Sequence, residues 1–282
     1  MTDDVVALVL ARGLGRRMQE APSGDAVALT PEQATAAAAG LKSMMPIAEP
    51  GRPARPFLDY GLSELADAGF TRVALIVAPQ GESSDPLREY YLGSGRPTRL
   101  SLDFVVQAEP RGTADAVAAA ADWVGRSAFV VLNADNLYGV KTLEALRLAD
   151  DPALPVYERD ELVRSSAIPP ERVASFALLT LRPDGTLEDI VEKPGAAAVD
   201  AAGPHAHISM NCWRGDRRLI DACRDVERSP RGEFELPMAV RLAVQRGVVF
   251  RGLAGTGPVL DLSRRDDVKG IMAMLAGLEP RP

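Results

Sequence analysis

The chain opens with an apolar run that leads directly into a glycine turn and a cluster of arginines. The run covers residues 5–10 and is followed by Ala11-Arg12-Gly13-Leu14-Gly15-Arg16-Arg17-Met18. Glycines allow a sharp turn that brings backbone N–H groups against an anion, and guanidinium groups add donors in a fixed fork. No Gly-Lys-Ser/Thr follows, so this is not a Walker loop, and Met18 stands where a dinucleotide fingerprint has its third glycine. The pattern predicts a strand and a phosphate-binding turn, and we expect a nucleotide as the ligand.

Further apolar runs alternate with helical patterns in the first half of the chain. The runs cover residues 5–10, 73–78, 102–107 and 129–133, and the helical patterns cover residues 56–69 and 113–124. Nearly continuous apolar strands between helices indicate a sheet that is buried on both faces and largely parallel. We therefore predict a Rossmann-like α/β fold, with a mostly parallel twisted sheet flanked by helices and ligands bound at the carboxyl ends of the strands.

The second half is richer in strand patterns. A hairpin is predicted from residues 174–181 and 186–191 around Pro183-Asp184-Gly185, followed by strands at residues 205–214, 248–253 and 259–262. Helices are predicted at residues 216–227 and 236–247, and a last helix behind a capping box formed by Ser263 and Asp266. These patterns predict a smaller β-rich lobe within one compact unit.

An insertion separates the glycine turn from the next element. Residues 19–40 are small and polar and then alanine-rich, and Thr30-Pro31-Glu32-Gln33 matches a capping box with proline at the first helical position. The insertion predicts a short helix, either as a lid or flank over the site or as part of a disordered excursion.

Composition narrows the classes of partner. The 282 residues carry a net charge of -7, which argues against a general nucleic-acid binder, so an anionic substrate must meet a local basic pocket. The two cysteines are too few for a disulfide framework, and no leader or membrane-spanning run is evident, so we expect a cytoplasmic protein without membrane contact. Lysine is rare: Lys42, Lys141, Lys193 and Lys269 are the only four.

Seven short segments occur in an order that resembles the sugar-1-phosphate nucleotidylyltransferases. They are residues 10–17, Lys42-Ser43-Met44-Met45-Pro46-Ile47, residues 107–114, Asn133-Ala134-Asp135-Asn136, Glu192-Lys193-Pro194, Gly232-Glu233-Phe234-Glu235-Leu236 and Leu260-Asp261-Leu262. Together the segments carry the resemblance from about residue 5 to residue 275. Two departures stand out: Arg12 and Leu41, where the family usually has glycine and proline.

The resemblance implies a reaction between a nucleoside triphosphate and a sugar-1-phosphate. In this family a sugar-1-phosphate oxygen attacks the α-phosphate and pyrophosphate leaves, so rate comes from positioning and charge stabilisation. The match places the catalytic arginine at Arg17 and a phosphate-binding lysine at Lys42. Asp135 and Asp261 each end an apolar strand and would together hold Mg²⁺.

The same resemblance assigns the binding residues. Nucleotide contacts are expected from Leu10, Ala11, Gly13, Gly15, Gln107, Gly112 and Thr113, and sugar-phosphate contacts from Glu192, Lys193 and Asn211. The Gln107 amide can pair a donor and an acceptor with a base edge, Gly112 would let the base or ribose approach, and Thr113 can also cap its own helix. Residues 1–139 would form the nucleotide-binding half, and residues 140–282 the sugar-phosphate half with the C-terminal helix. The base expected from Gln107 is uracil or thymine, the default sugar is glucose, and a homo-oligomer is common in the family.

Two other functions are compatible with parts of the pattern. Arg12, Ala134 and the insertion favour a catalytically silent nucleotide-sugar sensor or regulatory subunit of the same fold. A nicotinamide-dependent dehydrogenase needs an acidic residue about 20 positions after the glycine turn, at the end of a second strand, and the insertion occupies that region.

Overall fold

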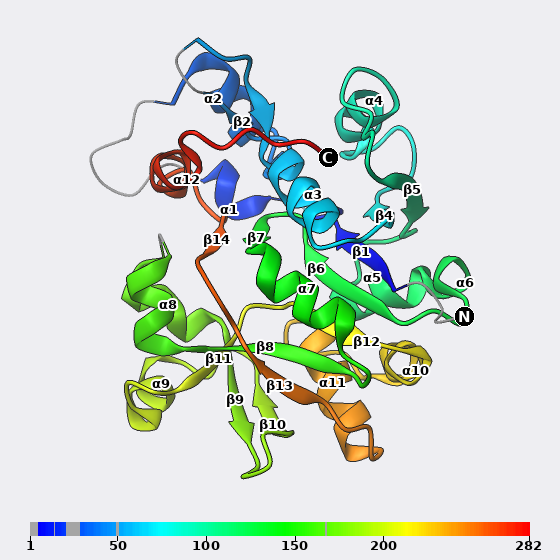
Figure 1. Ribbon diagram of the computed structural model, residues 1–282, viewed down its shortest axis with the longest axis vertical. Helices are drawn as coiled ribbons and strands as arrows, with labels where there is room; N and C mark the ends of the chain where they lie inside the picture. Colours follow the sequence, from blue (N-terminus) through cyan, green and yellow to red (C-terminus); the bar gives the residue numbers. More distant parts are fainter. Residues whose placement is uncertain (1–4, 14, 21–28, 49–50, 167) are drawn as a thin grey trace.

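One ten-stranded sheet organises the computed structural model, which describes residues 5–13, 15–20, 29–48, 51–166 and 168–282 (Figure 1). Its order from edge to edge is β10 (Leu187–Val191), β9 (Ala177–Leu181), β11 (His207–Ser209), β8 (Ala153–Glu158), β12 (Trp213–Gly215), β6 (Phe129–Asn133), β1 (Val6–Leu10), β4 (Arg72–Val77) and β5 (Ser101–Val106). Strand β13 (Arg251–Ala254) pairs with β8 off this path.

The parallel part of the sheet comes from the four apolar runs of the first half. Strand β1 pairs in parallel with β4 and β6, and β4 with β5. In this register Leu10 lies between Ile76 and Asn133, so the carboxyl ends of the strands meet at one edge. The four predicted strands and the α/β class are confirmed.

Antiparallel pairs extend the sheet into the β-rich lobe. Strand β12 pairs with β6 and β8, β11 with β8 and β9, and β9 with β10 as the predicted hairpin. The single strand predicted over residues 205–214 is wrong, because Asn211 takes a φ of 60° and divides it into β11 and β12. That positive φ removes residue 211 from extended geometry, and the two short strands pair with different neighbours.

Helices cover both faces of the sheet. One face packs against α3 (Phe57–Asp67), α4 (Asp85–Leu92), α7 (Val140–Leu148), α8 (Arg159–Ser165), the 3₁₀ helix η1 (Pro170–Ser175) and α9 (Ala196–Ala202). The other face packs against α5 (Thr113–Ala119), α6 (Ala121–Val124), α10 (Arg217–Asp225) and α11 (Leu236–Gln245). Strand β1 contributes Ala7 and Val9 to the first core and Val6 and Leu8 to the second, as period-two alternation requires. The helix predicted over residues 113–124 is present but divides at Ala120.

A third cluster brings the end of the chain back to its beginning. It joins α1 (Arg16–Gln19), α2 (Pro31–Ala38), β2 (Pro46–Ile47), the first turn of α3, β7 (Asn136–Tyr138), β14 (Val259–Asp261) and α12 (Asp267–Leu275), and β2 pairs with β3 (Arg55–Pro56). Figure 1 shows α12 beside α1 and α2. Buried Met18, Leu260 and Val268 share this cluster.

The capping boxes have opposite outcomes. At α2 the box is confirmed, since Thr30 Oγ1 accepts from the Gln33 N–H at 3.2 Å and Gln33 Oε1 accepts from the Thr30 N–H at 3.1 Å. The box predicted from Ser263 and Asp266 is wrong: α12 starts only at Asp267, and the Asp267 carboxylate accepts from the backbone N–H groups of Ser263 and Arg264. Residues 21–28 of the insertion lie outside the described residues. In the part of the chain that is described, no α2 residue lines the larger cavity below, and no helix is long and apolar enough to cross a membrane.

Candidate active site

A cavity of about 490 Å³ opens where the carboxyl ends of the parallel strands face the β-rich lobe. It collects every predicted site residue except Ala11: Leu10, Gly13, Gly15, Arg17, Lys42, Gln107, Gly112, Thr113, Asp135, Glu192, Lys193, Asn211 and Asp261. Ala11 lines a second cavity of about 210 Å³, which shares Leu10, Gly13, Lys42 and Asp135 with the first. Residues more than 250 positions apart therefore converge on one space.

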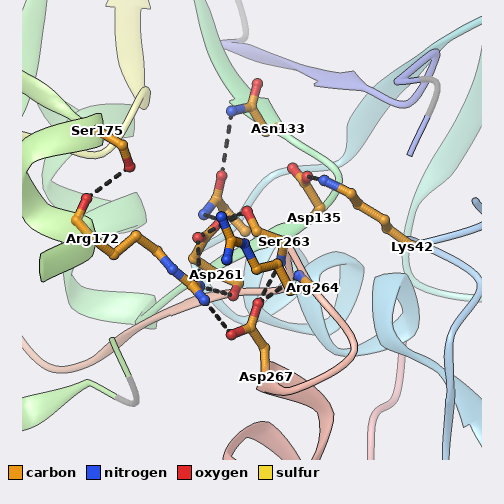
Figure 2. Close-up of polar contacts among 10 residues, drawn as sticks. Lys42, Asn133, Asp135, Arg172, Ser175, Asp261, Ser263, Arg264 and Asp267 are labelled. Carbon is orange, nitrogen blue, oxygen red and sulfur yellow. Dashed lines mark hydrogen bonds and ion pairs between the residues drawn. The ribbon is translucent and has the colours of Figure 1, made fainter. Parts of the chain in front are cut away.

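The two aspartates face this cavity from the end of β14 and from the turn between β6 and β7, and each has a cationic partner (Figure 2). Asp261 lies opposite Asn136 in the antiparallel β7–β14 pair, and Asp135 immediately precedes β7. Lys42 Nζ lies 3.0 Å from Asp135 Oδ2, and an Arg172 guanidinium nitrogen lies 3.2 Å from Asp261 Oδ2. Burial first, and then the negative charge of Asp135, raise the pKa of Asp261 above its usual value.

The donor set at this point suits magnesium. Mg²⁺ is held by one or two carboxylates together with waters and substrate phosphates, and two aspartates in a shared cavity supply that number. The charge of Asp135 disfavours the charge of Asp261, and a bound divalent cation would relieve that cost. Within the described residues, no group of three or more His, Cys, Asp or Glu side chains forms a metal cluster, so a closed zinc-type site is not present there.

The glycine turn carries cations to the rim of the cavity. Arg16 and Arg17 are exposed on the four-residue helix α1 and line the cavity. Gly15 has a φ of 59°, and a Cβ there would lie 2.1 Å from the Gly40 carbonyl oxygen, so the turn packs directly on that segment. At the other end of α1, Arg265 Nε donates to the Met18 carbonyl at 2.9 Å. Both contacts fix the helix that bears Arg17.

Gln107 is held more tightly than the sequence suggested. Its side chain is buried, and its Nε2 donates to the Gly112 carbonyl at 3.0 Å and to Asp115 Oδ2 at 2.8 Å. These acceptors use both amide N–H groups and fix the amide orientation. In this geometry both amide N–H groups are engaged within the protein and Oε1 is the group left for a ligand, and contact of Gln107 with a base stays a prediction.

Gly112 and Thr113 also serve a neighbouring element. A Cβ at Gly112, where φ is 124°, would lie 2.4 Å from the Phe234 carbonyl oxygen, so the close approach is made by this backbone segment. Thr113 does not cap its own helix: its Oγ1 accepts from the Leu236 N–H at 2.8 Å, at the start of α11. The sequence-based cap is thus corrected, since the acceptor serves a helix 123 residues away.

The β-rich lobe contributes a pair of unsatisfied acceptors. Among the described residues, Glu192 Oε2 and Asn211 Oδ1 are buried without a hydrogen-bond partner. Lys193 and Asn211 both have positive φ values, 49° and 60°, a strained conformation that functional sites often retain. Burial and the charge of Glu235 raise the pKa of Glu192 to about 7, against a lowering by Arg231. Lys193 Nζ lies 3.8 Å from Glu192 Oε1, so a cation adjoins the acceptors.

Two arginines of the site were missed by sequence reasoning. Arg231 lines the cavity from the loop before α11, where it bonds to Glu235 Oε1; its signal was its position directly before the Gly-Glu-Phe-Glu-Leu segment. Arg172 contacts Asp261 and Asp267 from η1, and no local pattern singled it out.

Comparison with known proteins identifies the family to which the chain belongs. The nucleotidyl transferase family model matches residues 41–256, and the chain belongs to that family. A low-salt glycan biosynthesis nucleotidyltransferase, Agl11, of Haloferax volcanii is 24% identical over 81% of this chain and 58% of its own length. The glucose-1-phosphate thymidylyltransferase of Mycolicibacterium smegmatis is 27% identical over 76% of this chain and 68% of its own. The chain thus spans about three fifths to two thirds of the length of these relatives.

Solved structures show the same fold. A UDP-glucose pyrophosphorylase complexed with UDP-glucose aligns with a TM-score of 0.69 and 17% identity, over 96% of this chain and 97% of the other. A UDP-glucose pyrophosphorylase from Acinetobacter baumanii aligns with a TM-score of 0.69 and 18% identity, over 98% and 95%.

Proposed function

We propose that the protein joins a nucleoside triphosphate to a sugar-1-phosphate and releases a nucleoside-diphosphate sugar and pyrophosphate. The observation that carries this proposal is the single cavity in which a carboxylate pair, several cations and two unsatisfied acceptors meet. A membership in the nucleotidyl transferase family supports it.

The chemistry follows from charge. A sugar-1-phosphate oxygen is already anionic near neutral pH, so it attacks the α-phosphorus without a general base. The new P–O bond forms as the bond to the bridging oxygen breaks, and that electron pair leaves with pyrophosphate. Arg17 would neutralise charge on the leaving group, and Lys42 would hold the phosphates as a point charge.

Asp135 and Asp261 are the residues that would hold Mg²⁺. When bound, the ion neutralises phosphate charge and orients the triphosphate. The chain's own cations already face these carboxylates, so binding of metal and substrate would redistribute the Lys42 and Arg172 contacts.

The two substrates would occupy different walls. Leu10, Ala11, Gly13, Gly15, Gln107, Gly112 and Thr113, all in the half formed by residues 1–139, would receive the nucleotide. In the half formed by residues 140–282, Glu192 and Asn211 would accept from sugar hydroxyls and Lys193 would contact the sugar phosphate. The unpaired side-chain oxygens of Glu192 and Asn211 support this arrangement, because a hydroxyl donor would remove the free-energy cost of a buried acceptor that has no partner.

Pyrophosphate release tests the proposal. The purified protein is incubated with each nucleoside triphosphate, a panel of sugar-1-phosphates and Mg²⁺; we expect release with uridine or thymidine triphosphate and glucose-1-phosphate, and loss on chelation. Asp135→Asn and Lys42→Gln should each lower the rate on the order of 100-fold, because each removes charge at the phosphates. Lys141→Gln, which changes an exposed lysine on α7, is the matched control and should turn over normally.

Nucleotide-sugar binding without Mg²⁺-dependent turnover for any pair would contradict an enzyme. That outcome would favour the sensor or regulatory subunit, a function to which the arginine in the glycine turn and the ion-paired carboxylates are also suited.

A further inference from the structure

Arg12 is buried at the carboxyl end of β1, although it belongs to the same turn as two exposed arginines. Its side chain is 6% exposed and lines the larger cavity. One guanidinium nitrogen donates to the backbone carbonyl of Gln107, at the end of β5, and the other lies 3.2 Å from Glu82 Oε2. The guanidinium is therefore fixed in place beside Gln107.

This position separates Arg12 from the cations that face the carboxylates. Lys42 lies against Asp135, which follows β6, whereas Gln107 follows β5 at the opposite edge of the parallel part of the sheet. Arg16 and Arg17 are exposed on α1. Of the cations Arg12, Arg16, Arg17 and Lys42, Arg12 is the one that donates to the backbone carbonyl of Gln107 and so lies on the side of the cavity that Gln107 lines.

On this side of the cavity, Gln107 and Arg12 offer a ligand complementary hydrogen-bonding groups. Both N–H groups of the Gln107 amide are used inside the protein, so the amide offers an incoming ligand an acceptor only. An arginine offers donors only, in a planar group with five N–H bonds. Ile76, Pro110 and Ala116 add apolar surface to the same cavity. One acceptor, fixed donors and apolar walls suit a flat heteroaromatic ring with polar edges.

We propose that Arg12 is a specificity-determining residue for the nucleobase. This inference rests on the proposed function, which puts a nucleoside triphosphate in the cavity. A guanidinium N–H of Arg12 donates to a carbonyl oxygen or ring nitrogen of the base, next to a base N–H that donates to Gln107 Oε1. Arginine thus replaces, by a side-chain contact, the close backbone approach that a glycine would allow at position 12.

Binding of ligands with and without a base tests the role of Arg12. Affinities of the four ribonucleoside triphosphates, thymidine triphosphate and inorganic tripolyphosphate are measured by calorimetry for the wild type, Arg12→Gln and Arg12→Lys. We expect Arg12→Gln to weaken the preferred nucleotide at least tenfold, the least preferred less than threefold and tripolyphosphate less than twofold. Arg12→Lys keeps the charge without the planar group and should recover only part of the selectivity.

Glu82→Gln is the matched control, since it removes the same ion pair and leaves the guanidinium in place; it should keep the wild-type order of affinities. Thermal melting of each variant confirms folding. Equal loss for all nucleotides and for tripolyphosphate would make Arg12 a phosphate ligand, and unchanged selectivity would give it no role in recognition; either result overturns the inference. If selective binding depends on Arg12 but no nucleotide sugar is formed, the proposed function fails and the inference stands.

Discussion

At the scale of single residues, burial of the Glu192 carboxylate carries an electrostatic cost that can be measured. Its carboxylate is largely buried, one oxygen has no partner among the described residues, and Glu235 lies close enough to disfavour its charge. The positive φ values of Lys193 and Asn211 add backbone strain beside it. Such costs are retained where a ligand recovers them, and here the ligand would be a hydroxyl-bearing sugar.

Glu192→Gln should make the protein more stable at alkaline pH. Burial raises the pKa of Glu192 from 4.5 to about 7, so its contribution to stability is full below pH 4.5 and is lost as pH rises through about 7. The glutamine variant has no charge to bury, and we expect its free energy of unfolding to exceed that of the wild type by about 3 kcal/mol at pH 8 and to match it near pH 4.5. Urea unfolding across this pH range measures the difference, with the exposed Glu227→Gln as control. A difference independent of pH would contradict the prediction.

At the scale of elements, hydrogen bonds hold the N-terminal ends of α5 and α11 against each other. The Phe234 carbonyl accepts from the Ala114 N–H at 2.9 Å, and the Phe234 N–H donates to the Arg111 carbonyl at 2.8 Å. Gly112 leaves room for this crossing, and Thr113 caps α11. Two walls of the cavity are thereby held in one orientation.

Thr113→Val should destabilise the fold by about 1 kcal/mol, because the isosteric side chain cannot accept from the first N–H of α11. Chemical denaturation measures the loss, and Thr113→Ser, which retains the hydroxyl, should recover most of it. A valine variant as stable as the wild type would show that solvent caps α11 equally well.

At the scale of the whole molecule, Arg172 links parts of the chain that meet only in the folded protein. From η1 in the β-rich lobe it reaches Asp261 on β14 and Asp267 on α12, and both aspartates are almost fully buried. Ser175 and Phe176, at the end of η1 and just after it, line the cavity. The same arginine thus joins the sugar side of the cavity to the segment that carries a proposed metal ligand.

Arg172→Met should lower the free energy of unfolding by roughly 3 kcal/mol or more, because it leaves two buried carboxylates without their cation. Arg164→Met is the comparison: Arg164 pairs with Glu161 on the surface of α8 with 74% of its side chain exposed, and its loss should cost less than about 1 kcal/mol. Thermal and urea unfolding of both variants test the contrast, and equal losses would contradict a structural role for the buried pair.

Local pattern predicted the elements with short-range causes. The four apolar runs became β1, β4, β5 and β6, and the capping box at Thr30 formed as expected. The local pattern failed at two places, where Asp267 rather than Asp266 accepts from the backbone before α12 and where the positive φ of Asn211 interrupts a predicted strand. Helices α4 and α7 and strands β7 and β8 were not predicted.

The ordered motifs of the family resemblance identified most of the site residues that converge on the cavity, because strand ends and glycine turns are encoded by neighbouring residues, but they missed Arg231. Which way those side chains point was decided by tertiary contacts: Arg12 bonds to a carbonyl 95 residues away, Thr113 caps a helix 123 residues away, and Asp261 meets Asn136 across 125 residues. A donor in a folded protein takes the acceptor that packing brings within reach, and sequence spacing carries no record of that distance.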